Sequence, residues 1–85
     1  MADVHHIKTW TPFFKEVKTG VKSFEVRFND RDYKVGDTLI LDDFDPDKQM
    51  YTGDWTAKLI TYKLDDPRFV KEGYVILGMK DIKIT

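Results

Sequence analysis

The chain has no cysteine among its 85 residues. This absence excludes a structural disulfide and a zinc site built on thiolates, and it is typical of a reducing compartment. No apolar run approaches the roughly 18 residues that a membrane-spanning helix needs. The opening residues, MADVHHIKTW, lack the apolar core of a signal peptide. The sequence therefore predicts a cytoplasmic protein without a membrane partner.

Internal repeats, low-complexity tracts and linkers are absent as well. With 41% hydrophobic and 14% aromatic residues, a chain of this length can bury a core of its own. We therefore expect a single domain over residues 1–85.

The net charge of −1 excludes a protein that coats nucleic acid through bulk positive charge. The charge is unevenly distributed, because residues 1–34 hold seven Lys and Arg against five Asp and Glu, whereas residues 35–85 hold seven against ten. Any contact with nucleic acid must come from a local basic patch.

One short helix is expected at residues 11–19. Thr11 can cap it, Pro12 suits its first position, and Gly20 suits a left-handed end. Such a short helix is stable only when its apolar face docks on a sheet. That face would consist of Phe13, Phe14 and Val17.

The rest of the chain has the pattern of strands. They are expected at residues 4–10, 22–29, 35–44, 55–64 and 74–85, with a long hairpin connection at 45–54 and a bulge between Leu59 and Ile60. The last strand has apolar residues on both faces and should be central. We predict a mainly β or α+β fold, a small and mostly antiparallel β-barrel with one N-terminal helix. The expected core is Phe13, Phe14, Val17, Phe24, Val26, Leu39, Leu41, Ile60, Val75 and Leu77.

A polar series runs through the second of these strands. Glu25 and Arg27 alternate with the apolar residues, so their side chains share a face about 7 Å apart. They could form a solvated ion pair of little energetic value. They could also form a site, because the arginine fork suits carboxylates, phosphates and base edges. Lys22 precedes the strand at a helix corner, and Asn29 and Arg31 follow in a charged turn.

His6 and Lys8 of the first strand share another polar face, which could border the same corner. The adjacent His5 and His6 point to opposite faces and make a poor chelating pair, so we expect no metal. Asp43, Asp45 and Asp47 alternate as in a calcium loop, but the glycine and late glutamate of such a loop are missing. We interpret this stretch as a solvated turn.

Taken together, these residues form a recognisable pattern. The spacing Gly20-x-Lys22-x-x-Glu25-x-Arg27 resembles the G-x-K-x-x-E-x-R signature of ASCH domains (activating signal cointegrator homology), in the PUA-like superfamily. Nearly the whole chain is similar to a small ASCH-like family of uncharacterised bacterial and phage proteins. That family combines an H-x-L-K start, which His6 and Lys8 match with Ile7 in place of Leu, with F-E-x-R-x-N-D-R, matched by residues 24–31.

The resemblance implies a PUA-like β-barrel with a cleft at the helix corner, binding RNA or a modified nucleoside without a cofactor. Its binding residues would be His6, Lys8, Lys22, Glu25, Arg27, Asn29 and Arg31. Some ASCH proteins are amidohydrolases that use a Lys and a Thr of this segment with a distant Glu. Lys22 matches the Lys, whereas Glu25 stands at the Thr position. The alternative function is therefore a small hydrolase, amidohydrolase-like or nuclease-like, with Lys22 as base and Glu25 as proton carrier.

Overall fold

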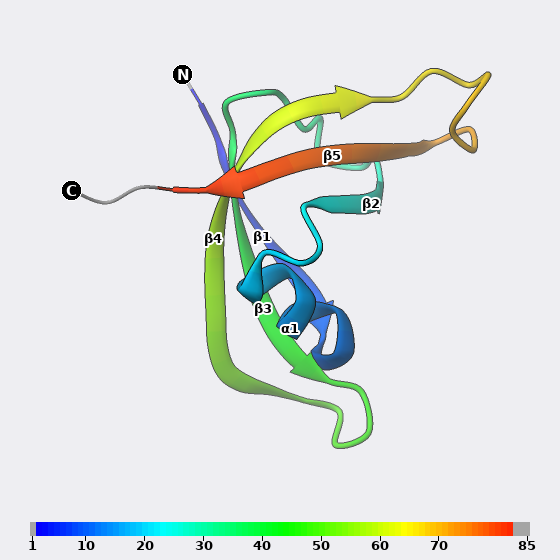
Figure 1. The fold of residues 1–85 in the computed structure, drawn as a ribbon. Helices are drawn as coiled ribbons and strands as arrows, with labels where there is room; N and C mark the ends of the chain where they lie inside the picture. Colours follow the sequence, from blue (N-terminus) through cyan, green and yellow to red (C-terminus); the bar gives the residue numbers. More distant parts are fainter. Residues whose placement is uncertain (1, 83–85) are drawn as a thin grey trace.

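The computed structural model describes residues 2–82 and contains one curled sheet and one short helix (Figure 1). The elements are β1 (Val4–Trp10), α1 (Thr11–Thr19), β2 (Phe24–Phe28), β3 (Thr38–Asp45), β4 (Met50–Leu64) and β5 (Tyr74–Asp81). The mainly β class with one N-terminal helix is confirmed. The last three residues of the expected final strand lie outside the described residues. Within residues 2–82 no helix has the length and apolar character needed to cross a bilayer.

The strands follow the order β1-β3-β4-β5-β2. β1 pairs with β3 in parallel, and the other three pairings are antiparallel. The hairpin connection and the bulge differ from expectation. β4 begins five residues earlier than predicted, so the hairpin connection shrinks to residues 46–49, and the bulge falls between Ile60 and Tyr62. β4 bends sharply and curls the sheet into a half-barrel (Figure 1). β5 lies between two strands, as its apolar pattern predicted.

The core fills the concave side of this half-barrel, beneath α1. Seven of the ten expected core residues are buried: Phe14, Val17, Leu39, Leu41, Ile60, Val75 and Leu77. Ile7, Tyr33 and Met79 complete the cluster. The prediction was wrong for Phe13, Phe24 and Val26, which are 50%, 46% and 51% exposed.

The error on β2 has a physical reason. Period-two alternation fixes which residues share a face of a strand, but it does not decide which face turns inward. On β2 the apolar face is turned outward, and Glu25 is turned inward with only 3% of its surface exposed. The inward carboxylate is accommodated because two cations lie beside it. Glu25 and Arg27 therefore do not lie on the solvated face that the sequence predicted.

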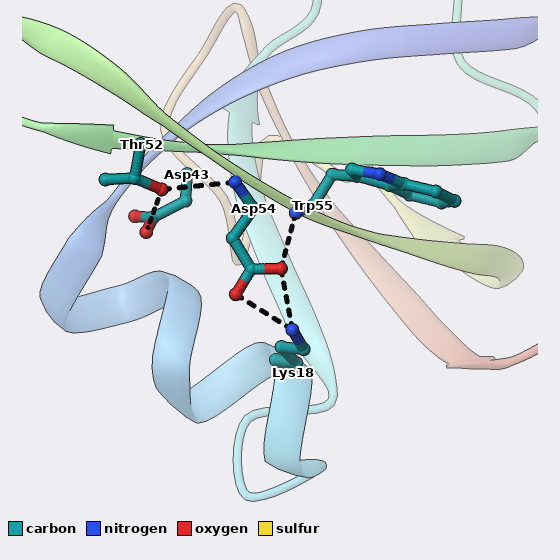
Figure 2. A network of polar contacts seen from close by, with 5 residues as sticks. All are labelled: Lys18, Asp43, Thr52, Asp54 and Trp55. Carbon is teal, nitrogen blue, oxygen red and sulfur yellow. Dashed lines mark hydrogen bonds and ion pairs between the residues drawn. The ribbon is translucent and has the colours of Figure 1, made fainter.

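A polar network fixes α1 against the sheet (Figure 2). Lys18 donates hydrogen bonds of 2.7 and 2.8 Å to the two carboxylate oxygens of Asp54, and Thr52 donates one of 2.7 Å to Asp43. Thr11 also donates to Asp43, at 2.7 Å, instead of capping the helix. Asp43 is thus a buried acceptor, and its interpretation as part of a solvated turn was wrong.

The other end of α1 closes as predicted. Gly20 adopts the left-handed conformation at φ 87°, and its N–H bonds the carbonyl of Val17 at 3.1 Å. The N–H of Lys22 then bonds the carbonyl of Glu16 at 3.0 Å. These bonds hold the chain where it turns from the helix into β2, and they fix the position of Lys22.

Candidate functional site

The two edge strands, β1 and β2, are joined by side chains. In the described residues no main-chain ladder connects them. Instead Arg27 donates a hydrogen bond of 3.2 Å to the main-chain carbonyl of Lys8, and Arg31 donates one to the carbonyl of His6. The carbonyls of an edge strand need partners, and here arginines supply them. These side-chain bonds link the two edge strands, which do not pair directly with each other in the described chain.

A cavity of about 270 Å³ lies at this gap. We call it the β1–β2 cleft. Its walls come from β1, the first turn of α1, the helix corner and β2. Its lining consists of Lys8, Thr9, Trp10, Phe13, Lys22, Glu25, Val26 and Arg27. The family resemblance implied a cleft at the helix corner, and four of the predicted site residues line this cavity: Lys8, Lys22, Glu25 and Arg27.

The charged centre of the cleft is Glu25. Lys22 Nζ lies 3.4 Å from its Oε1, and Arg27 Nη1 lies 3.8 Å from its Oε2. The Glu25 side chain is 5% exposed, compared with 20% for Lys22 and 27% for Arg27. The carboxylate therefore lies deeper than both cations. The accessible part of the site carries more positive than negative charge, and Lys8 adds to it.

Three further residues give the cleft a chemical character that sequence reasoning missed. Thr9 is buried, and no hydrogen-bond partner for its hydroxyl lies within residues 2–82. Trp10 and Phe13 are each about half exposed and line the same cavity. The strand pattern contained a signal for Thr9, because it shares the inward face with Ile7. No comparable signal separated Trp10 or Phe13 from core aromatics.

The remaining predicted site residues lie outside the cleft lining. His6 is exposed, with Nδ1 3.4 Å from a carboxylate oxygen of Asp42. The backbone N–H of Asn29 bonds the carbonyl of Gly73 at 2.9 Å, and its side-chain oxygen is buried without a partner in the described chain. Arg31 acts on the backbone of β1. The structure brings these three near β1 or the end of β2 but not into the cavity.

Another polar cluster is built on Asp37. One of its carboxylate oxygens lies 2.8 Å from His5 Nε2, and the carboxylate accepts backbone N–H groups of Asp3 at 3.0 Å and Lys34 at 3.1 Å. Burial raises the pKa of Asp37, but these hydrogen bonds outweigh burial, so the pKa lies below its usual value. Oxygen and nitrogen atoms of Asp3, His5 and Asp37 lie within 4.8 Å of one another. The hydrogen bonds account for this geometry without an ion.

Comparison with known proteins identifies the family. Residues 4–79 match the family described as "Domain of unknown function (DUF3850)", and the chain belongs to it. The chain is also 36% identical over 77 residues to the "Uncharacterized 12.9 kDa protein in GpA 3'region" of Escherichia phage P2. That alignment covers 91% of this chain and 68% of the relative. The part that matches the family contains every residue lining the β1–β2 cleft.

Proposed function

We propose that the protein is a cytoplasmic binding module for RNA or a modified nucleoside, with the β1–β2 cleft as its site. The observation that carries the proposal is the meeting of Lys22, Glu25 and Arg27 around one cavity, beside the buried Thr9 hydroxyl, which has no partner among residues 2–82. A purely structural ion pair would not need a cavity, and an unpaired hydroxyl costs free energy unless a ligand engages it.

Each part of the cleft has a matching part in a nucleotide. Lys8 and Lys22 supply positive charge for phosphate, and Arg27 keeps guanidinium donors beyond the one that bonds the backbone of β1. Trp10 and Phe13 supply aromatic surface for a base. Glu25 and the Thr9 hydroxyl can bond the polar edge of that base. The volume suits one nucleoside rather than a folded RNA element.

We further propose that the half-barrel is a PUA-like domain of the ASCH type. In support, Lys22, Glu25 and Arg27 of the G-x-K-x-x-E-x-R pattern line one cleft between the helix corner and the sheet. The arginine bridges between β1 and β2 also link the two edges of the half-barrel.

The test is a titration of a fluorescein-labelled RNA of mixed sequence, followed by anisotropy at several salt concentrations. With about three phosphate contacts on a single strand, log K against log salt should have a slope of about −2. Lys22→Ala should weaken binding and reduce this slope. Lys48→Ala is the matched control, because Lys48 is an exposed lysine of the distant hairpin turn. Absence of binding, or a slope of zero, would contradict the proposal.

A second candidate function is a small hydrolase acting on nucleosides or RNA. Two observations favour it: Lys22 Nζ lies 3.4 Å from Glu25 Oε1, and the Thr9 hydroxyl lines the same cavity without a partner in the described part of the chain. A base, a proton carrier and a hydroxyl are the groups that acyl transfer requires. Incubation with N-acylated nucleosides and with RNA, followed by chromatography, distinguishes the functions. Product that disappears in Lys22→Gln indicates the enzyme, and binding without product indicates the module.

A further inference from the structure

Apolar side chains form three successive rows on the outward face of β2 and of the neighbouring parts of β5 and β4. The strand register places Phe24, Gly78 and Tyr62 in one row across the three strands. Val26, Ile76 and Leu64 form the next row, and Phe28 and Tyr74 form the last. Directly paired residues share a face of a sheet. We call this surface the aromatic face, and it consists of Phe24, Val26, Phe28, Tyr62, Leu64, Tyr74 and Ile76.

This face is open to solvent in the described chain. Phe28 and Tyr62 are 58% and 64% exposed, and Phe24 and Val26 are about half exposed. Its rows contain no charged residue. These exposed apolar side chains are contiguous across three strands rather than scattered singly. The face exists because β2 turns its apolar side chains outward and Glu25 inward.

Cations lie over the aromatic rings at both ends of the face. Lys22 Nζ is 5.4 Å from the centre of the Phe24 ring, and Lys71 Nζ is 5.4 Å from that of Tyr74. Tyr74 in turn contacts Phe28 edge to face, with ring centres 5.6 Å apart. Aromatic rings combined with flanking positive charge are the composition of surfaces that bind single-stranded nucleic acid, where bases stack and phosphates meet cations.

The aromatic face is continuous with the β1–β2 cleft. Val26 belongs to the face and also lines the cleft, and Lys22 serves both, since its Nζ approaches the Phe24 ring and Glu25. We therefore expect a nucleic-acid strand with one nucleotide in the cleft to continue over Phe24 and Val26.

The size of the face also argues for this ligand. Five residues along and three strands across give about 17 Å by 14 Å, or about 240 Å². A stable protein interface takes about 20–30 residues from each partner, so the seven residues of this face are too few for one. Phe24 and Phe28 are four residues apart on the strand, which places them about 13 Å apart.

We propose that the aromatic face is a stacking platform for single-stranded nucleic acid that extends from the β1–β2 cleft over β2. This inference rests on the proposed function and narrows its ligand to a strand of several nucleotides rather than a free nucleoside or a duplex. The side chains of Phe24 and Phe28 would stack with bases, and Lys22 and Lys71 would contact phosphates.

The experiment compares two probes, uridine monophosphate and a fluorescein-labelled oligouridylate of about ten nucleotides, a length that spans such a platform. The oligonucleotide should bind more tightly than the monophosphate. Phe24→Ala and Phe28→Ala should each weaken oligonucleotide binding about 5- to 150-fold, the range found for single stacked bases. Phe28→Ala should leave monophosphate binding unchanged, because Phe28 is not among the residues that line the cleft. Trp55→Ala is the control, because Trp55 is an equally exposed aromatic residue outside the face.

The outcomes separate the two proposals. If both probes bind and the phenylalanine variants bind the oligonucleotide as the unchanged protein does, the platform is wrong and the cleft stands. If neither probe binds, the proposed function fails and the platform fails with it. Analytical sedimentation of the same variants measures whether the protein self-associates through this face. A self-association that is lost in Phe24→Ala, without any effect on RNA binding, would make the face a protein interface and overturn the inference.

Discussion

The guanidinium of Arg27 donates a hydrogen bond of 3.2 Å to the main-chain carbonyl of Lys8. One edge strand of the half-barrel thus satisfies the backbone of the other through a side chain. A main-chain ladder would bring the strands to about 4.8 Å and leave no room for a cavity between them. The arginine bridge holds them farther apart, and the cleft occupies the space.

Arg27 and Arg31 allow a matched comparison, because both donate to carbonyls of β1 but only Arg27 lines the cleft. Each change to alanine removes one such bond and should cost about 1 kcal/mol, or about 4–8 °C in the melting temperature. Only Arg27→Ala should also abolish RNA binding. Arg27→Lys should not restore it, since a point charge lacks the fork. Equal losses of binding in the two alanine variants would assign Arg27 a structural role only.

Glu25 tests the charged centre of the cleft. Glu25→Gln keeps the shape and the acceptor oxygen, so we expect weaker binding through poorer orientation of Arg27, with little change in stability. Glu25→Ala leaves Lys22 and Arg27 without their shared acceptor, and we expect a loss of about 1–3 kcal/mol. Urea unfolding measured beside RNA titration separates the effects. Unchanged RNA binding in both variants would show that the carboxylate has no part in the site.

Much of the fold was predictable because its signals are local. Alternation gave the strands, Gly20 gave the end of the helix, and the apolar run of β5 gave its central place in the sheet. The inward face of β2 was not predictable in this way, because alternation is equally satisfied by either face. The outcome depends on contacts with distant parts of the chain, such as the hydrogen bond from Arg27 to the Lys8 carbonyl on β1.

The same limit applies to the site. Lys22, Glu25 and Arg27 are close in the chain, so their meeting could be predicted from strand geometry. Thr9 and Trp10 join them from β1 only because the sheet curls until its edges approach each other. Arg31 was predicted to bind a ligand. In the structure it donates a hydrogen bond to the main-chain carbonyl of His6, and no sequence pattern indicates such a contact.

The buried contact between His5 and Asp37 should make stability depend on acidity. The pKa of Asp37 is depressed in the folded protein, so its carboxylate stabilises the fold above its unfolded pKa of about 3.9. This contribution is lost as the pH falls through the lower folded pKa. Asp37→Asn should therefore destabilise the protein by about 1–3 kcal/mol at pH 7, and the difference should shrink below about pH 4. Asp47→Asn is the exposed control, and a difference that did not change with pH would contradict the assignment.

Thr9→Val separates a functional hydroxyl from a structural one. Valine has nearly the same shape and suits a strand, but it removes a buried hydroxyl that has no hydrogen-bond partner in the described chain. Because an unpaired buried hydroxyl is costly, the variant should be more stable by about 1 kcal/mol, which raises the melting temperature by about 4–8 °C. The same change should weaken RNA binding, and it should abolish product formation if the protein is a hydrolase. Calorimetry and titration on one preparation give both results. A lower melting temperature would mean that the hydroxyl has a partner in the fold, and unchanged binding would remove Thr9 from the site.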